Sequence, residues 1–335
     1  MSNGGKGMNR REFLRRLAGF GAAGAALLFG PARLFGSQDL RKSFYQGRQG
    51  NSPGPGRETA AIRTAAAFPQ LVAVRGASPE KMFAAGMAAL GGMGRFVRSG
   101  GTVAVKPNIG WDVPPERAAD TNPALVAAIV EACLAAGARR VYVFDHPCDS
   151  WRACYRDSGI EDAAKAAGAT VAPASAESYY QEVAVKGAKV LTSTKVHELI
   201  LEADAFINVP VLKHHGGAGM TCGLKNLMGA VWDREAFHFR GLDVCIAEAA
   251  LAVRPSLTIV DASKVMLSGG PRGNGASRYA ELDMQILSPD IVAADAAASK
   301  AFGASPASFE YIGRAAALQI GTDNLDTLDI RRMVL

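Results

Sequence analysis

The sequence predicts an α/β domain built on a mainly parallel, open sheet with flanking helices. Short β-branched runs alternate with alanine-rich helical runs along the chain. Single helical runs separate successive strands, which is typical of right-handed βαβ units, and charged or imidazole side chains follow several strands. We therefore expect one large domain over residues 59–335, which could include a smaller subdomain.

The individual elements follow from local patterns in this order. Apolar, β-branched runs predict strands at residues 102–105, 140–144, 170–172, 205–209 and 257–260. Alanine-rich runs predict helices at residues 123–136, 160–167, 198–203, 242–253, 290–301 and 308–318. The first of these helices has Pro123 as its first residue, with Thr121 or Asn122 as its cap.

Residues 1–37 have the layout of a twin-arginine export signal. Adjacent Arg10 and Arg11 precede an apolar run over residues 17–30, which is short and glycine-rich for a permanent membrane helix. We expect export to the periplasm by the twin-arginine translocation machinery. A basic amphipathic helix is the alternative. No clear cleavage motif lies near residues 34–37, which leaves open that the segment stays as a membrane anchor.

Residues 38–58 read as a flexible linker, because they are rich in Gly, Ser, Pro, Gln and Arg. The whole chain has 37 basic and 31 acidic residues, a formal charge of +6. Six basic side chains and one acidic side chain within residues 1–36 account for +5 of this charge. The rest of the chain is nearly neutral, so the composition does not indicate a nucleic-acid partner.

The five cysteines show none of the spacings that bind metal clusters. They form no C-x-x-C pair and no zinc or iron–sulfur pattern, so an iron–sulfur cluster is not expected in this chain. Cys133 and Cys245 lie in apolar helical runs typical of a core. Cys148 and Cys154 could form a disulfide in an oxidising compartment, but their spacing alone does not decide this.

Polar side chains follow four of the predicted strands. The four segments are residues 106–112, 145–149, 210–217 and 261–264. In an open α/β sheet the carboxyl ends of the strands converge on one crevice, where ligands bind. One such residue is an ordinary loop residue, but four such segments predict a binding crevice.

A glycine-containing segment over residues 221–229 adds a possible anion site. Thr221 could cap a helix that starts at Cys222, and the start of a helix favours an anion. Lys225 and Asn226 would then lie three and four residues into that helix. The alternative is a loop that only turns the chain and leaves Lys225 in solvent.

These segments together resemble the family called domain of unknown function 362. The resemblance covers residues of about 70 to 330. It is carried by Val-Lys-Pro-Asn at 105–108, Asp-His at 145–146, Val-Leu-Lys-His-His at 211–215, Leu-Lys-Asn-Leu-Met-Gly at 224–229, Ile-Val-Asp-Ala at 259–262 and Asp-Ile-Val-Ala-Ala-Asp at 290–295. It implies an α/β domain and, in many members, an iron–sulfur module, for which this chain lacks the cysteines. It implies no settled reaction.

The candidate site residues fall into two groups. Lysines and asparagines suit a small anionic ligand, and these are Lys106, Asn108, Lys213, Lys225 and Asn226. A divalent metal is the other possibility, with His146, His215 and Asp261 as ligands. Histidines beside a polar crevice also hydrogen-bond or move protons, so these alternatives stay open. Asp295 could lie at the solvated edge of its helix or face the crevice.

Two functions from different classes fit these residues. The first is an exported enzyme that acts on a small anionic substrate, with His146 or His215 moving protons and Asp145 or Asp261 orienting the imidazole or binding metal. The second is a non-catalytic protein that binds a cofactor or metal, or assists maturation, for a periplasmic partner. The chain has no G-x-S-x-G, redox C-x-x-C or Walker motif that would favour a particular reaction.

Overall fold

The computed structural model describes residues 68–335. The predicted export signal, the predicted linker and residues 59–67 lie outside the described residues. Among the helices of the described part, none is both long enough and apolar enough to cross a membrane.

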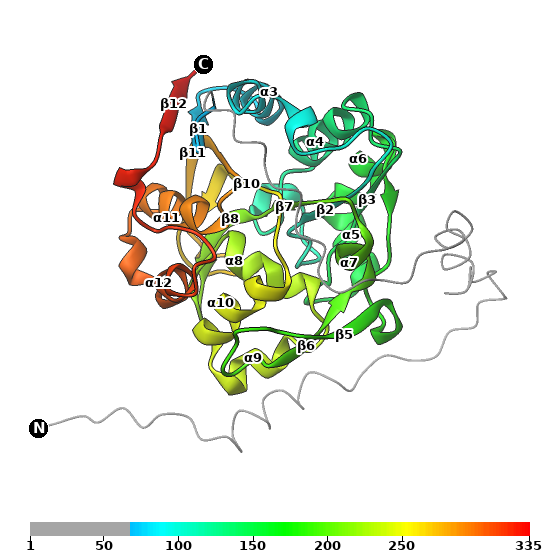
Figure 1. The fold of residues 1–335 in the computed structure, drawn as a ribbon. Helices are drawn as coiled ribbons and strands as arrows, with labels where there is room; N and C mark the ends of the chain where they lie inside the picture. Colours follow the sequence, from blue (N-terminus) through cyan, green and yellow to red (C-terminus); the bar gives the residue numbers. More distant parts are fainter. Residues whose placement is uncertain (1–67) are drawn as a thin grey trace, which may run out of the picture. The chain divides into compact units, whose positions relative to one another are not determined.

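One mixed, mainly parallel sheet organises the described part of the chain and confirms the predicted α/β class (Figure 1). The strand order is β12-β1-β11-β10-β7-β2-β3-β4, and β8 joins through β10 and pairs with β9. The strands of this sheet are β1 (Leu71–Arg75), β2 (Thr102–Pro107), β3 (Arg140–Val143), β4 (Thr170–Val171), β7 (Ala205–Val209), β8 (Val211–His215), β9 (Gly219–Thr221), β10 (Leu257–Met266), β11 (Tyr279–Ser288) and β12 (Ile330–Val334). A separate hairpin pairs β5 (Tyr180–Ala184) with β6 (Ser193–His197).

Helices cover both faces of the sheet, as Figure 1 shows. One face carries α3 (Pro79–Ala89), α4 (Pro123–Ala135) and α6 (Ile160–Ala166), with α5 (Trp151–Asp157) beside α6. The other face carries α8 (Gly223–Asn226), α10 (Leu242–Ala252), α11 (Ile291–Ala301) and α12 (Glu310–Ala317), with α9 (Glu235–Arg240) next to α10. The short α7 (Glu198–Glu202) follows β6.

The two central strands explain where polar groups become buried. Every residue of β2 and of β7 is buried, because helices cover the sheet on both sides. Most of these residues are apolar and join the main core, which includes Val103, Val105 and Ile207. Thr102, Lys106 and Asn208 are the exceptions, and Lys106 and Asn208 lie near the carboxyl ends of their strands. A buried ammonium and a buried amide need partners, and these partners form the site described below.

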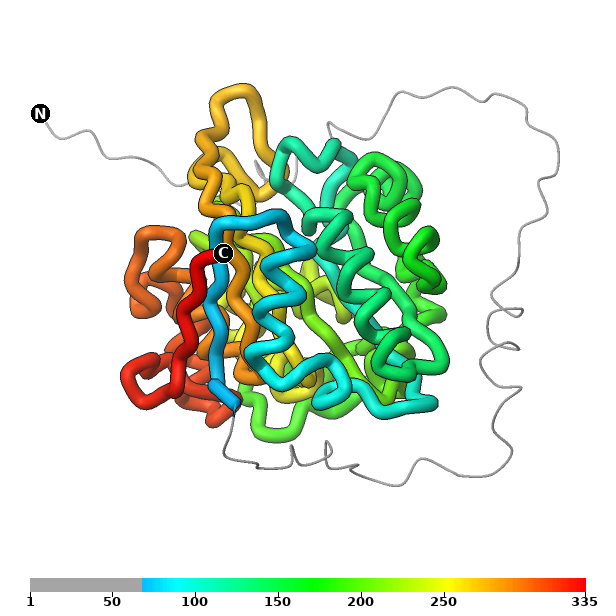
Figure 2. The backbone as a smooth tube through the Cα atoms, turned by 90° about the horizontal axis from the view of Figure 1, so that it is seen from above, coloured from blue at the N-terminus to red at the C-terminus, as the bar shows by residue number. Residues whose placement is uncertain are grey.

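The structure also departs from the predicted elements. The strands β1, β11 and β12 and the hairpin were not predicted, and Figure 2 shows β12 running beside β1 at one edge. The strand predicted to end at Val260 continues to Met266, because β11 returns antiparallel and pairs with its full length. The helix after β2 agrees with the prediction, since Asn122 caps it through the N–H of Ala124.

Candidate functional site

A cavity of about 260 Å³ lies at the carboxyl ends of β2, β3 and β8, next to α8 and α9. It brings together all of the predicted site residues except Asp261. The lining residues are Lys106, Asn108, Gly110, Trp111, Asp145, His146, Cys148, Lys213, His215, Thr221, Lys225, Asn226, Met228, Gly229, Arg234, Glu235, His238 and Pro271.

Asp261 lies away from this cavity, so the prediction that it joins His146 and His215 around a metal is wrong for this structure. Since β10 continues past Val260, Asp261 falls inside the strand and not at its end. Its buried carboxylate accepts the N–H of Asn122 at 2.8 Å and of Ser263 at 3.1 Å, and burial raises its pKa. The described residues contain no group of three or more His, Cys, Asp or Glu side chains that could hold a metal ion.

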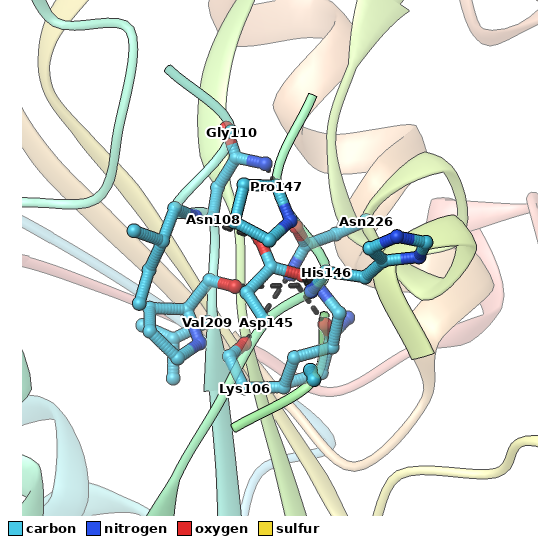
Figure 3. A network of polar contacts seen from close by, with 12 residues as sticks. Lys106, Asn108, Gly110, Asp145, His146, Pro147, Val209 and Asn226 are labelled. Carbon is cyan, nitrogen blue, oxygen red and sulfur yellow. Dashed lines mark hydrogen bonds and ion pairs between the residues drawn. The ribbon is translucent and has the colours of Figure 1, made fainter. Parts of the chain in front are cut away.

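Lys106 and Asp145 form a buried ion pair beneath the cavity (Figure 3). The ammonium lies 2.7 Å from Oδ1 of Asp145, and both side chains are almost fully buried. Asp145 also accepts the backbone N–H groups of Ile109 at 2.7 Å and His146 at 2.9 Å. Burial lowers the pKa of Lys106, and the Asp145 charge opposes this shift.

This pairing corrects the predicted role of Asp145. Its carboxylate oxygens already accept three donors, none of which is an imidazole, so it does not orient a histidine ring. A Cβ atom on Gly229 would lie 1.9 Å from Oδ1 of Asp145 and 2.8 Å from the Lys106 ammonium. The glycine is required because the backbone passes directly over the ion pair. Asp145 therefore acts as a structural counter-ion.

A chain of amides connects the lysines of the cavity. Nζ of Lys213 donates to Oδ1 of Asn108 at 2.7 Å, and Nδ2 of Asn108 donates to Oδ1 of Asn226 at 3.2 Å. Nδ2 of Asn226 donates to the Lys106 carbonyl at 3.3 Å and to Oδ1 of Asn208 at 2.9 Å. Both N–H groups of the Asn226 amide are thus used within the protein. Asn226 positions its neighbours, and only Asn108 keeps a spare donor for a ligand.

Lys213 is fully buried beside a second carboxyl group, Asp120. Its ammonium donates to the Ala119 carbonyl as well as to Asn108, and burial lowers its pKa to about 8. Asp120 accepts the N–H of Gly110 at 2.6 Å and of Trp111 at 3.1 Å through Oδ1. Its Oδ2 is buried without a hydrogen-bond partner, and burial raises its pKa to about 7 although the Lys213 charge opposes this.

Lys225 differs from the other two lysines because its charge has no protein partner. Its side chain is half-buried in the cavity wall, and within residues 68–335 it makes no hydrogen bond or ion pair. Burial lowers its pKa to about 8, and the positive charges of Arg234 and Lys213 add to this shift. At pH 7 such a lysine is still about nine-tenths protonated. The cavity wall therefore presents an uncompensated positive charge.

The predicted anion site at the start of α8 is filled by the protein itself. Thr221 ends β9 and does not cap the helix, which begins at Gly223. The carboxylate of Asp295 accepts the N–H of Gly223 at 2.6 Å and of Leu224 at 3.0 Å. Asp295 is completely buried, which raises its pKa to about 7, so it lies neither at a solvated edge nor in the cavity.

His215 is held as a neutral hydrogen-bond donor. Its Nδ1 accepts the backbone N–H groups of Gly217 and Ala218, each at 3.0 Å. An accepting Nδ1 carries no proton, so the proton of the neutral ring lies on Nε2. Burial lowers the pKa to about 3, and the nearby charge of Lys225 contributes. His215 can therefore donate to an oxyanion but has no free basic nitrogen.

His146 has the opposite tautomer. Its Nδ1 lies 3.4 Å from the Val231 carbonyl, which can only accept, so Nδ1 carries the proton and Nε2 keeps a lone pair. The ring stacks on Trp232 with centroids 4.9 Å apart and an angle of 2°. Burial, followed by the charge of Arg234, lowers its pKa to about 4. His146 is thus a neutral acceptor in the cavity wall, and its orientation comes from Val231 and Trp232.

Several lining residues were not identified from the sequence. Arg234 donates to the carbonyls of His146 and Pro147 and so joins α9 to the segment after β3. Cys148 is exposed and lines the cavity, whereas the other four cysteines are buried. All five thiols are free, so Cys148 and Cys154 are not joined in this structure.

The chain belongs to the family described as domain of unknown function (DUF362), whose model matches residues 103–300. This match confirms the resemblance drawn from the sequence motifs. The matched range contains every cavity-lining residue named above. The Leu-Lys-Asn-Leu-Met-Gly motif at 224–229 now has a physical explanation: it supplies the unpartnered Lys225, the amide of Asn226, and Gly229 over the ion pair.

Two named proteins are similar to this chain. A thylakoid-associated protein of Synechocystis sp. is 30% identical over 225 residues, which cover 62% of this chain and 64% of that protein. The match thus spans less than two thirds of the relative. The structure of the lactate racemase apoprotein from Thermoanaerobacterium thermosaccharolyticum has a TM-score of 0.39 and 14% identity, covering 58% of this chain and 50% of that chain.

Proposed function

We propose that this chain is an exported protein that binds a small anion in the cavity, and that it is an enzyme acting on that anion. The observation that carries this proposal is the half-buried Lys225 side chain, whose ammonium has no hydrogen-bond or ion-pair partner among residues 68–335. Export to the periplasm through the twin-arginine machinery is part of the proposal and rests on residues 1–37 alone.

The charges of the lining residues favour an anion over a cation. Lys106 is neutralised by Asp145, which leaves Lys213, Lys225 and Arg234 as positive groups. Glu235, which is exposed, is the only other acidic residue among the described residues that line the cavity. A bare divalent metal would meet these cations and few free oxygen or nitrogen ligands, so a phosphate or carboxylate group fits the cavity better.

The two histidines give the cavity complementary chemistry. His146 offers an unprotonated Nε2 that can take a proton from a bound substrate, whereas His215 offers an Nε2–H that can donate to a developing oxyanion. Lys225 would hold the anionic group of the substrate. This arrangement fits proton abstraction from a substrate that already carries an anionic group.

A non-catalytic carrier for a periplasmic partner is the second candidate. The observation that favours it is the structural use of Asp145, which leaves His146 as the only free base among the three predicted catalytic groups. A carrier would hold its anionic ligand without turnover. Mass spectrometry of the exported protein under native conditions separates the two, since a carrier should retain a stoichiometric ligand.

Calorimetric titration with inorganic phosphate and with malonate tests anion binding directly. We expect the wild-type protein to bind at least one of them, and Lys225→Met to lose the binding while unfolding at nearly the same urea concentration. Lys186→Met is the matched control, because Lys186 is exposed and lies outside the cavity. Equal binding by wild type and Lys225→Met would contradict the proposal, as would the absence of binding by the wild type.

A further inference from the structure

Three charged side chains from distant parts of the sequence meet beside the cavity. Asp112 follows β2, Asp149 follows β3, and Arg272 lies in the connection between β10 and β11. The guanidinium of Arg272 places Nη2 2.5 Å from Oδ1 of Asp112 and Nε 3.2 Å from Oδ2 of Asp149. One side chain thus bridges three separate segments.

Each of these three residues is next in sequence to a residue that lines the cavity. The lining neighbours are Trp111, Cys148 and Pro271. Figure 2 shows the gold β10–β11 connection extending at the same end of the sheet as the segment that follows β2. The bridge therefore joins the three stretches of chain that form this side of the cavity wall.

We propose that Arg272 is a positioning residue that holds these three segments together and so controls entry to the cavity. The bridge itself is described by the structure, whereas its effect on a ligand rests on the proposed anion-binding function. Without Arg272, the outer part of the β10–β11 connection would lose both of its ion pairs to the segments after β2 and β3. The connection would then be free to separate from these two segments.

The ion pairs of Arg272 are weak enough to break while the protein stays folded. The side chains of Arg272, Asp112 and Asp149 are 51%, 30% and 32% exposed, so the bridge lies at the surface, although Oδ2 of Asp149 itself is shielded from solvent. Ion pairs in such positions are weak and are screened by salt, although one guanidinium holding two carboxylates is stronger than an isolated pair. A contact of this strength lets the three segments separate without unfolding the sheet.

The base of the β10–β11 connection is fastened independently of Arg272. The N–H of Gly270 donates to Nδ1 of His214 at 3.2 Å, and the N–H of Leu267 donates to the Arg278 carbonyl at 2.7 Å. A Cβ on Gly270 would lie 2.1 Å from the His214 carbonyl oxygen, so the backbones are in close contact there. Removing the Arg272 side chain should therefore free the outer part of the connection and leave the fold intact.

Alkylation of Cys148 by iodoacetamide, followed by mass spectrometry, tests the bridge without any ligand. Cys148 is the one exposed thiol among the five cysteines of the chain, and it is adjacent to Asp149. We expect Arg272→Ala and Asp149→Asn each to raise the alkylation rate about three- to tenfold. Loss of a weak ion pair shifts the equilibrium between the joined and the separated segments by factors of this size. Potassium chloride should raise the wild-type rate toward that of the variants.

The two variants together separate opening from a simple charge effect. If only the local charge mattered, removing the cation would slow thiolate formation and removing the carboxylate would speed it, so the rates would change in opposite directions. An increase in both supports the bridge, and opposite or absent changes overturn it. Arg278→Ala is the matched control, because its guanidinium donates a hydrogen bond to Ser268 of the same connection and has no ion pair within the described part of the chain.

Phosphate binding kinetics then connect the bridge to the cavity. In Arg272→Ala, we expect phosphate to associate and dissociate faster than in the wild type, with little change in Kd. Arg272→Lys should restore the slower rates only in part, because an ammonium cannot bind two carboxylates in the planar geometry of a guanidinium. If wild-type protein binds no phosphate, the proposed anion binding fails for this probe, while the alkylation result still decides the bridge. Unchanged phosphate kinetics in Arg272→Ala would contradict control of entry.

Discussion

Two lysines of one cavity, Lys106 and Lys225, have opposite surroundings. Lys106 is fully buried and its charge is neutralised by Asp145 at 2.7 Å. Lys225 is half-buried and has no hydrogen-bond or ion-pair partner in the described part of the chain. The first arrangement stabilises the fold, and the second leaves a charge available to a ligand. Two lysines that line the same cavity therefore have different roles.

The same contrast separates the two histidines. His215 uses Nδ1 to accept two backbone N–H groups, whereas His146 uses Nδ1 to donate to a carbonyl. The free nitrogen is therefore a donor in one ring and an acceptor in the other. His146 can therefore accept a proton from a ligand, and His215 can donate a hydrogen bond to one, but neither ring can do both in its neutral form.

Removing the counter-ion of Lys106 should have the largest effect on stability. Asp145→Ala would leave the buried Lys106 ammonium without its counter-ion, which typically costs about 3–5 kcal/mol, although its hydrogen bond to the Pro107 carbonyl remains. Urea unfolding followed by circular dichroism measures this loss. Glu161→Ala, which breaks the exposed pair with Lys165, should cost under about 1 kcal/mol. A similar small loss in both variants would show that the buried pair is not a structural element.

Gly229→Ala should be the next most destabilising change. Its Cβ would lie 1.9 Å from Oδ1 of Asp145, so the ion pair or the backbone must move, at a cost of about 1–3 kcal/mol or more. Gly94→Ala is the control, because a Cβ there meets nothing within 4 Å. Equal unfolding midpoints for the two variants would contradict the requirement for glycine at 229.

The lowered pKa of the His215 ring makes stability depend on pH. Its pKa is about 3 in the folded protein and near 6.5 when unfolded, so the unfolded state binds more protons between these values. Stability from this group is complete above about pH 6.5 and falls as the pH drops toward 3. In His215→Gln, unfolding measured from pH 7 to pH 4 should show a shallower loss, by about 1–3 kcal/mol. An unchanged pH slope would show that protonation of His215 does not oppose folding.

Lys225→Met should have the smallest effect on stability, under about 1 kcal/mol, because its ammonium has no hydrogen bond or ion pair within residues 68–335 to lose. Anion affinity in the wild type should fall as the pH rises through about 8, since the lysine then loses its charge. Titrations at pH 7 and pH 9 check this direction. A large loss of stability in Lys225→Met would place Lys225 with Lys106 as a structural residue.

Sequence patterns predicted the central part of the fold and most of the cavity. The helix from Pro123 and the buried strand of β7 have strong local signals, and parallel strands bring the residues at their carboxyl ends together. Lys106, His146, Lys213 and Lys225 therefore share one cavity, as predicted. The strands β1 and β12 were missed because their pairing depends on residues more than 200 positions apart, such as Val72 and Leu287.

The role of each residue in the cavity could not be predicted from the sequence, for a different reason. Whether a charge is paired depends on distances between segments, so the sequence could not show that Asp145 is occupied by Lys106 or that Asp295 occupies the start of α8. Asp261 was misplaced because the sequence does not show that β11 returns along β10. One local signal of a buried polar network was present in the sequence, since Asn208 is a polar residue inside the apolar strand β7.

Proton uptake on anion binding tests the central claim most directly. An anion beside Lys225 raises the pKa of its ammonium above about 8, so binding at pH 8 should take up about half a proton per anion. Calorimetric titration with phosphate or malonate in buffers of different ionisation enthalpy measures this number. We expect uptake in the wild type and in Lys186→Met, and no binding by Lys225→Met. Binding without proton uptake, with equal affinity in Lys225→Met, would contradict the assignment of Lys225 as the anion-binding group.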